Sequence, residues 1–337
     1  MDSKYSTIEL FAGAGGMALG FEKAGFEPLL LVEKDKYACK TLKRNRPLWP
    51  VLQGDVSLTD YSGLKPTIVA GGFPCQSFSH AGKRLGLEDT RGTLFYEFAR
   101  CIKETKPSIF IGENVYGLLT HNNGQTFKTI IDVLSDLEYN IEYKLMNAAD
   151  YGVPQRRKRI IIVGVSKESN LRFKWPKKDA VVLTLKDALK NCPASPCASY
   201  QEKKAKVLAM VPPGGDWRDL PDDIAKEYMG KSYYNSGGRT TYAKRLSWEE
   251  PCLTILCTPS QMQTERCHPD ETRPLSVRES ARIQTFPDDW IFEGCIAAQY
   301  KQIGNAVPVE LAYRLADSVA QVLSGCVVEN ENLFDGF

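Results

Sequence analysis

Short apolar runs alternate with amphipathic stretches along the first half of the chain, and this alternation constrains the fold more than any other feature. From Ile8 to about Gly164 the runs read IELF, LLLVE, TIVAGG, SIFIGEN, YNIEYKLM and RIIIVGV. Between them, Thr93–Lys103 and Gln125–Leu137 place apolar residues three and four positions apart, the spacing of a covering helix. Strands that alternate with helices predict an α/β fold built on a largely parallel sheet.

The character of the chain changes after about Pro176, where turn-rich segments such as PASPC, PPGGD and NSGGRTTY replace long periodic stretches. Helical patterns return in SVRESARIQTF and in Glu310–Leu323. We therefore predict a first domain over residues 1–183 and a smaller irregular, β-containing domain over 184–276. A final segment over 277–330 should bring its last helix back to the first domain.

The composition of the 337 residues, with 43% hydrophobic and 25% charged, is that of an ordinary globular protein. Its 43 Lys and Arg against 41 Asp and Glu leave a net charge of +2, so a local basic face could still bind a phosphate backbone. No apolar window approaches a membrane span, and the first residues lack a secretion signal. We expect a cytoplasmic protein with no membrane partner.

Ten cysteines stand at irregular spacings without a C-x-x-C pair, which predicts reduced thiols and no disulfide framework. Several cysteines and one histidine of the second half could suggest zinc, but their spacings do not form paired ligand hairpins. We predict no metal. These residues are Cys192, Cys197, Cys252, Cys257, Cys267 and His268.

A glycine turn follows the first apolar run, in the segment IELFAGAGG from Ile8 to Gly16. Such a turn brings backbone N–H groups and a helix N-terminus close to a ligand. Glu33 ends the second run and could accept both ribose hydroxyls, while Asp55 after VLQGD could accept from an adenine amino group. The glycines lack the G-x-G-x-x-G spacing, which favours an adenosyl ligand over a pyrophosphate. The alternative is a tight turn with two solvated acids.

Three clusters of reactive residue types follow apolar runs or lead into one. Cys75 lies in GGFPCQSFS directly after TIVA, at the sheet edge where open α/β sheets place their ligands. Glu113 ends SIFIGEN, where a half-buried carboxyl could carry a proton. Arg157 and Arg159 alternate in YGVPQRRKR and could point into the same site. Simpler alternatives are a buried inert thiol, a helix-capping glutamate and a solvated or phosphate-binding basic cluster.

Together these segments resemble the cytosine-5 DNA methyltransferases, over nearly the whole chain. The motifs occur in the order of that family: FAGAGG, VEKD, GD, GFPCQSFS, RGTLFYE, ENV, NAADYGVPQRRKR, RPLSVRESARIQTFPDDW and QIGNAVP. The resemblance implies a Rossmann-like S-adenosylmethionine-dependent domain and a target-recognition domain over 184–276. It also implies methyl transfer to C5 of a flipped-out cytosine in a short specific duplex DNA sequence, with S-adenosylhomocysteine as the second product.

The resemblance assigns roles to the catalytic candidates. The Cys75 thiolate would add to C6 of cytosine, which makes C5 able to attack the sulfonium methyl group. Glu113 would protonate or hydrogen-bond N3, Arg157 would support the activated ring, and Arg159 would contact the base carbonyl. Loss of the C5 proton and β-elimination would then release 5-methylcytosine.

The resemblance also implies a donor site. Glu33 would hold the ribose, Asp55 the adenine amino group, and Leu94 an apolar wall. In this family the position after the ribose glutamate is often aromatic, and here it is Lys34, so we expect adenine to pack on Phe11 and Val56. The remaining donor contacts would be Gly13, Ala14, Gly15, Gly16 and Asn305.

For DNA, the resemblance points to the loop of residues 76–92, which would close over the flipped base. Thr254, in LTIL, matches a Thr-Leu signature of the target-recognition domain. Polar residues there could read base edges. The phosphate candidates in the loop are Gln76, Ser77, Ser79, Lys83, Arg84 and Arg91. The base-reading candidates are Asn235, Arg239, Lys244, Arg245, Gln261, Gln263 and Arg266.

Three other functions stay open at this point. A tRNA cytosine-5 methyltransferase would carry a Cys-Phe-Thr signature where this chain has CLTIL. A nicotinamide dehydrogenase would leave FPCQ, ENV and QRRKR unexplained, and a non-catalytic DNA-binding module would be expected to lack the Cys–Glu–Arg set. The favoured interpretation is a modification enzyme that acts as a monomer on duplex DNA near the nucleoid. It could be paired in function, without a stable complex, with a restriction endonuclease.

Overall fold

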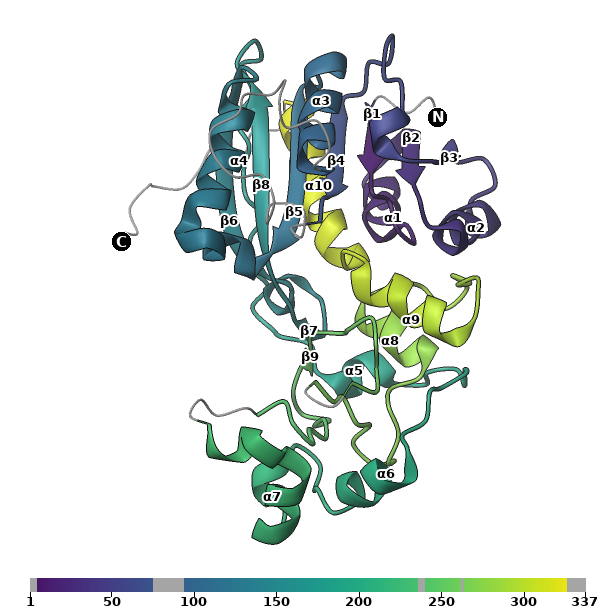
Figure 1. Ribbon diagram of the computed structural model, residues 1–337. Coiled ribbons are helices and arrows are strands. Elements are labelled where there is room, and N and C mark those ends of the chain that lie inside the picture. The colour runs from purple at the N-terminus through teal and green to yellow at the C-terminus, as the bar shows by residue number, and fades with distance from the viewer. Residues whose placement is uncertain (1–4, 75–93, 236–239, 262–263, 326–337) are drawn as a thin grey trace.

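The computed structural model describes residues 5–74, 94–235, 240–261 and 264–325. Its main sheet has seven strands in the order β3-β2-β1-β4-β5-β8-β6, which runs from right to left in Figure 1. The strands are β1 (Tyr5–Leu10), β2 (Phe26–Glu33), β3 (Val51–Gln53), β4 (Ile68–Gly72), β5 (Ile109–Val115), β6 (Tyr139–Asn147) and β8 (Lys158–Ser166).

Most strands of this sheet run in one direction, as the alternation of the sequence predicts. Pairs β1–β2, β2–β3, β1–β4 and β4–β5 are parallel, whereas β8 is antiparallel to both of its neighbours, β5 and β6. Residues 109–111 and 161–162 are fully buried, as expected for strands covered on both faces. The carboxyl ends of β1, β2, β4 and β5 point toward the smaller domain, so the motifs after these strands meet at one edge (Figure 1).

Helices cover both faces of the sheet. On one face, α3 and α4 pack over a core that includes Phe98, Phe110 and Ile130. On the other face, α1 packs against α10, where a Cβ on Gly20 would meet the backbone of α10. The last helix, α10, therefore lies against the first region of the chain. The bounds are α1 (Gly16–Lys23), α2 (Lys36–Asn45), α3 (Leu94–Thr105), α4 (Gln125–Ser135) and α10 (Val309–Leu323).

The described part of 184–276 is mostly irregular chain with short helices. It has a core of its own that includes Tyr200, Leu208, Val211 and Cys267. The two-residue strand β9 (Cys252–Leu253) pairs in parallel with β7 (Gln155–Arg156) and joins the two regions. The helices are α5 (Leu185–Leu189), α6 (Glu202–Ala209) and α7 (Asp222–Met229). The exact domain boundaries stay a prediction.

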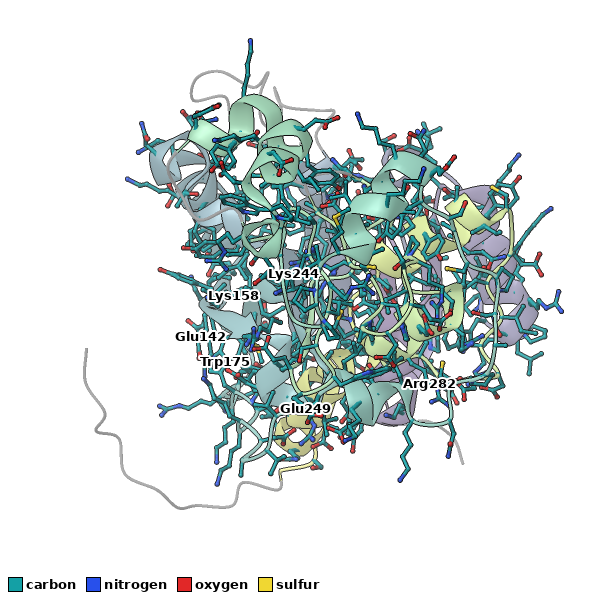
Figure 2. All side chains as sticks on the ribbon, turned by 90° about the horizontal axis from the view of Figure 1, so that it is seen from below. Glu142, Lys158, Trp175, Lys244, Glu249 and Arg282 are labelled. Atoms are coloured by element: carbon teal, nitrogen blue, oxygen red, sulfur yellow. The ribbon has the colours of Figure 1, made fainter. Side chains whose placement is uncertain are left out.

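The segment after residue 276 forms the junction between the regions. Helix α8 (Val277–Ile283) begins with a capping box, in which Ser276 and Glu279 each accept the backbone N–H of the other. With α9 (Ile296–Asn305) it packs against α2 and α5 around Trp290. The connection out of β8 runs back along β6, where Trp175 Nε1 donates to Glu142 at 2.9 Å (Figure 2).

Single-turn 3-10 helices occur at several connections. They are η1 (Val56–Leu58), η3 (Tyr116–Leu119), η4 (His121–Gly124), η5 (Ala148–Tyr151), η6 (Trp217–Asp219) and η7 (Gly230–Tyr234).

Candidate active site

The ends of β4 and β5 bring the chain that leads to Cys75 beside Glu113. Gly72 pairs with Glu113 in the parallel ladder, and a Cβ on Gly72 would lie 3.1 Å from Glu113 Oε2. The buried Asn114 donates from Nδ2 to the carbonyl of Phe73 at 2.7 Å. These contacts hold the backbone up to Pro74 at this edge. Cys75 itself lies outside the described residues.

Glu113 and Arg159 form a nearly buried ion pair. Arg159 Nε lies 2.8 Å from Glu113 Oε1, and the two side chains are 13% and 11% exposed. The antiparallel register explains the contact, because Arg159 stands opposite Val115, two residues beyond Glu113 on the same face. The alternative role of Glu113 as a helix cap is wrong, since η3 begins after Val115 without a side-chain cap.

Arg157 lies at the break between β7 and β8 and is 2% exposed. Its Nη2 donates to the carbonyl of Gly304 at 3.1 Å and its Nη1 to that of Ile255 at 3.4 Å. Nε has no hydrogen-bond partner within the described parts of the chain. Burial, and next the positive charge of Arg159, lower the pKa of Arg157. The predicted pair of arginines therefore splits: Arg159 binds a carboxylate and Arg157 binds backbone carbonyls.

The glycine turn after β1 depends on backbone conformations that side chains disfavour. Gly13 and Gly15 have φ of +53° and +86°, and Phe11 also has a positive φ, +59°. Gly16 must lack a side chain, because its Cβ would collide with the carbonyl oxygen of Val307. The turn thus presents the start of α1 at the carboxyl edge of the sheet.

Glu33 is held against this turn by its own carboxylate. Oε2 accepts the N–H of Gly13 and Oε1 accepts the N–H of Asp35, both at 2.7 Å. Asp35 Oδ2 in turn forms an ion pair with Lys301 Nζ of α9, at 2.9 Å. Lys301, which no sequence pattern marks, thereby ties the C-terminal segment to the loop after Glu33.

Asp55 is already engaged on both oxygens. Oδ2 lies 2.9 Å from Lys34 Nζ, and Oδ1 accepts from the backbone and hydroxyl of Ser57. Lys34, and next the Ser57 bonds, lower the pKa of Asp55 to about 2. Val56 is buried and Leu94 packs against the same core, so both can form apolar walls. The residue that departs from the family pattern, Lys34, therefore contacts the residue expected to bind adenine.

Asn305 ends α9, where its Oδ1 lies 2.9 Å from Cys257 Sγ of the second domain. It is exposed, one turn beyond Lys301. The C-terminal segment therefore reaches the same edge as Glu33 and Arg157.

Most of the DNA-binding candidates cannot be placed. Residues 76, 77, 79, 83, 84, 91, 239 and 263 lie outside the described residues. Thr254 Oγ1 donates to the carbonyl of Arg156 at 2.8 Å, which fixes the β7–β9 junction. Asn235 and Gln261 are exposed.

Three of the base-reading candidates are instead used inside the domain. Arg266 donates to the carbonyls of Thr254 and Glu265, and Lys244 donates to that of Gly214. Arg245 is 4% exposed, and its guanidinium donates to five backbone carbonyls and one hydroxyl. These acceptors are Leu208, Val211, His268, Pro269, Glu271 and Thr272.

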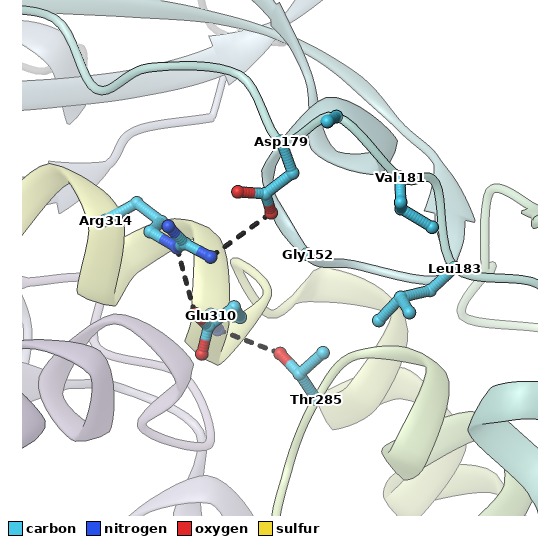
Figure 3. Close-up of a pocket in the computed structure, with 8 residues that line it drawn as sticks. Gly152, Asp179, Val181, Leu183, Thr285, Glu310 and Arg314 are labelled. Carbon is cyan, nitrogen blue, oxygen red and sulfur yellow. Dashed lines mark hydrogen bonds and ion pairs between the residues drawn. The ribbon is translucent and has the colours of Figure 1, made fainter.

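A hollow of about 540 Å³ lies away from this edge, beside the start of α10. Its charged groups are paired with one another: Arg314 binds Asp179 and Glu310 (Figure 3). Within the described ranges, no group of three or more His, Cys, Asp or Glu residues could hold a metal ion. No helix in these ranges is long and apolar enough to cross a membrane.

Comparison with known families decides between the open interpretations. The family model for C-5 cytosine-specific DNA methylases matches residues 5–321. The chain belongs to this family. As a member it is a DNA cytosine-5 methyltransferase with a methyltransferase's α/β fold, and the nicotinamide dehydrogenase and the non-catalytic module are left without support.

Similar curated proteins are modification enzymes of restriction systems. The chain is 56% identical to the Type II methyltransferase M.Eco47II of Escherichia coli, over 95% of this chain and 79% of the relative. It is 54% identical to M.PspPI of Psychrobacter sp. (strain TA137), over 95% and 80%. It is 48% identical to M.Sau96I of Staphylococcus aureus, over 95% and 76%.

Solved structures share the fold. A DNA modification methyltransferase encoded within a prophage of E. coli has a TM-score of 0.70 and 25% identity, over 95% of this chain and all of that one. The Dnmt2 methyltransferase of S. pombe has a TM-score of 0.64 and 14% identity, over 96% and 99%, a likeness of fold alone.

Proposed function

We propose that the enzyme methylates C5 of a flipped-out cytosine in a short duplex DNA sequence, with Cys75 as nucleophile and S-adenosylmethionine as methyl donor. One observation carries the assignment of the site. The Glu113–Arg159 pair lies beside the backbone that leads directly to Cys75, because Gly72 pairs with Glu113 and Asn114 holds Phe73.

Each of the four catalytic candidates would have its own role in the methyl transfer. The Cys75 thiolate adds to C6 of the cytosine ring while Glu113 hydrogen-bonds or protonates N3, which leaves C5 electron-rich. Arg159, held by Glu113, contacts the base carbonyl, and Arg157 supports the ring. When bound, the sulfonium donor supplies the methyl group. Loss of the C5 proton then lets the electrons return and expel the Cys75 thiolate.

The donor site fits an adenosyl ligand on two observations. Glu33 is fixed by two backbone N–H groups, and each of its oxygens keeps a lone pair for a ribose hydroxyl. Gly13 leaves the turn open to close approach, because a Cβ there would meet no atom nearer than 4.0 Å, whereas Gly15 and Gly16 let the turn pack against the protein interior. Phe11, Val56 and Leu94 would line the apolar part. Asp55 would accept the adenine amino group while it stays bound to Lys34, and Ala14 and Asn305 would complete the site.

Duplex DNA would lie between the sheet edge and the second domain. Extruding the base costs a few kcal/mol, which contacts to the displaced duplex must offset. The residues proposed for these contacts are Gln76, Ser77, Ser79, Lys83, Arg84, Arg91, Arg239 and Thr254. We further propose that the enzyme acts as a monomer near the nucleoid and is paired in function with a restriction endonuclease.

Substitution of Cys75 by serine tests this function. The variant should bind unmethylated plasmid DNA like the wild type, but it should neither transfer a labelled methyl group nor form a covalent complex with DNA that contains 5-fluorocytosine. Cys295→Ser, which changes an exposed cysteine, is the matched control and should do both.

Full activity of Cys75→Ser would show that the nucleophile assignment is wrong. Labelling of tRNA but not of duplex DNA by the wild type would contradict the DNA substrate.

A further inference from the structure

Two buried glutamines connect the segments that surround Arg157. Gln155, in β7, and Gln284, which follows α8, are both fully buried. Gln155 Nε2 donates to Gln284 Oε1 at 2.8 Å, although the two residues are 129 positions apart. Both residues lie inside motifs of the sequence, but no role follows for either from the motifs alone.

The other amide atoms of the two glutamines bind the chain at Ile255 and the end of α9, and these two segments also bind the guanidinium of Arg157. Gln155 Oε1 accepts the N–H of Ile255 at 3.0 Å. Gln284 Nε2 donates to the carbonyls of Ile303 and Ala306, at 2.7 and 3.0 Å. Since Gln284 Nε2 faces two acceptors, its oxygen must face Gln155, so the orientation of both amides is determined.

The acceptors of Arg157 lie on these same segments. Ile255, whose N–H binds Gln155, offers its carbonyl to Nη1, and Gly304, between Ile303 and Ala306, offers its carbonyl to Nη2. The N–H of Arg157 also donates to the carbonyl of Gln155. Gly304 is in the last turn of α9, where free carbonyls and the helix dipole favour a cation.

We propose that the Gln155–Gln284 amide pair is a positioning device for Arg157. It ties together β7, the second domain and the end of α9, so that the carbonyls of Ile255 and Gly304 stay at the right separation for one guanidinium. Arg157 is buried, and its Nε has no partner in the part of the chain that the structure describes, so the direction of its guanidinium depends on these carbonyls and not on solvent. The inference rests on the proposed function of Arg157 at the reacting base.

The test is Gln155→Met in the full-length enzyme, with Gln302→Met as the matched control. Gln302 is a buried amide of α9 whose side chain binds Thr41 and the carbonyl of Glu293 instead of the segments that hold Arg157. We expect Gln155→Met to lower the single-turnover rate of methyl transfer at least about tenfold, because Arg157 loses its direction. The Kd values for S-adenosylhomocysteine and for unmethylated plasmid DNA should change less than about twofold. Gln302→Met should leave the rate within about twofold.

An unchanged rate, or a loss of DNA affinity as large as the loss of rate, would overturn the positioning role. If Gln155→Met does not fold by circular dichroism, Gln155→Asn keeps the amide but shortens it by one methylene group, and the same separation of rate from affinity decides. Wild-type enzyme that methylates no DNA would instead contradict the proposed function, so the two failures are distinguishable.

Discussion

The sheet edge and the second domain both bury arginines, but they use them differently. At the sheet edge Arg159 binds the carboxylate of Glu113, while Arg157 binds two backbone carbonyls and its Nε has no partner among the described residues. In the second domain, the guanidinium of Arg245 donates hydrogen bonds to backbone carbonyls. The sheet satisfies its own backbone through ladders, whereas irregular chain has carbonyls left over. The proposed function therefore gives the buried arginines of the first region a part in the chemistry, whereas Arg245 holds the irregular chain of the second together.

The largest effect on stability should come from the loss of the Arg245 guanidinium. Arg245→Met should lower the free energy of unfolding by about 3–5 kcal/mol, because several buried carbonyls lose their donor at about 1–3 kcal/mol each. Urea denaturation measures this loss. Arg156→Met, which removes a half-exposed partner of Glu250, should cost no more than about 1 kcal/mol. Equal stabilities of the two variants would remove the distinction between the regions.

The corresponding change at the sheet edge should affect rate rather than stability. Glu113→Gln should lower the rate of methyl transfer at least about 100-fold, or about 2.7 kcal/mol of activation free energy. Binding of S-adenosylhomocysteine should stay near normal, because Glu33 and not Glu113 contacts the glycine turn. Single-turnover kinetics measure the rate, and calorimetry on the same preparation measures the binding of S-adenosylhomocysteine. Unchanged turnover would exclude the proton-carrying role.

Gly304 lies where the two regions touch, and a side chain there should disturb both. A Cβ on Gly304 would lie 2.5 Å from the backbone of Leu256 and Cys257. Gly304→Ala should therefore cost about 1–3 kcal/mol of stability, since backbone must shift to admit it. Gly117→Ala, with open space around its Cβ, is the control and should unfold like the wild type. If Gly304→Ala unfolded at the same urea concentration as the wild type, the junction between the two regions would be packed less tightly than these contacts imply.

The smallest effect concerns the exposed pair beside the donor site. Lys34→Met should raise the pKa of Asp55 from about 2 toward its ordinary value of 3.8, as an NMR titration of the carboxyl carbon would show. The folded-state pKa is lowered, so any stability from this pair is present above pH 3.8 and is lost as pH falls toward 2. At pH 7 the variant should unfold like the wild type, because an exposed pair is screened by water. An unmoved pKa would contradict the Lys34 contact.

The architecture of the first region could be predicted because its residues repeat with the periods of strands and helices. The apolar runs became the strands of the sheet, and Glu33 and Glu113 fell at its carboxyl edge as their positions indicated. The motif order identified the family, which the comparison confirmed. The roles of individual site residues stay predictions.

Other features depend on contacts that sequence spacing does not encode. Lys244, Arg245 and Arg266 look like ordinary surface cations, and no period reveals burial in irregular chain. The partnership of Gln155 with Gln284 joins residues 129 positions apart, so only the folded backbone shows it. Lys34 was noted as a departure, but its contact with Asp55 follows from the strand order β3-β2, which places the ends of two neighbouring strands together.

The packing of α10 on α1 has a consequence for synthesis on the ribosome. Met17 and Phe21 of α1 pack in one cluster with Leu311 and Leu315 of α10, which are made almost three hundred residues later. Until α10 emerges, the apolar surface that it covers stays exposed to water. The nascent chain must therefore stay unaggregated while the whole second domain is translated, and this core is completed only once α10 has been made.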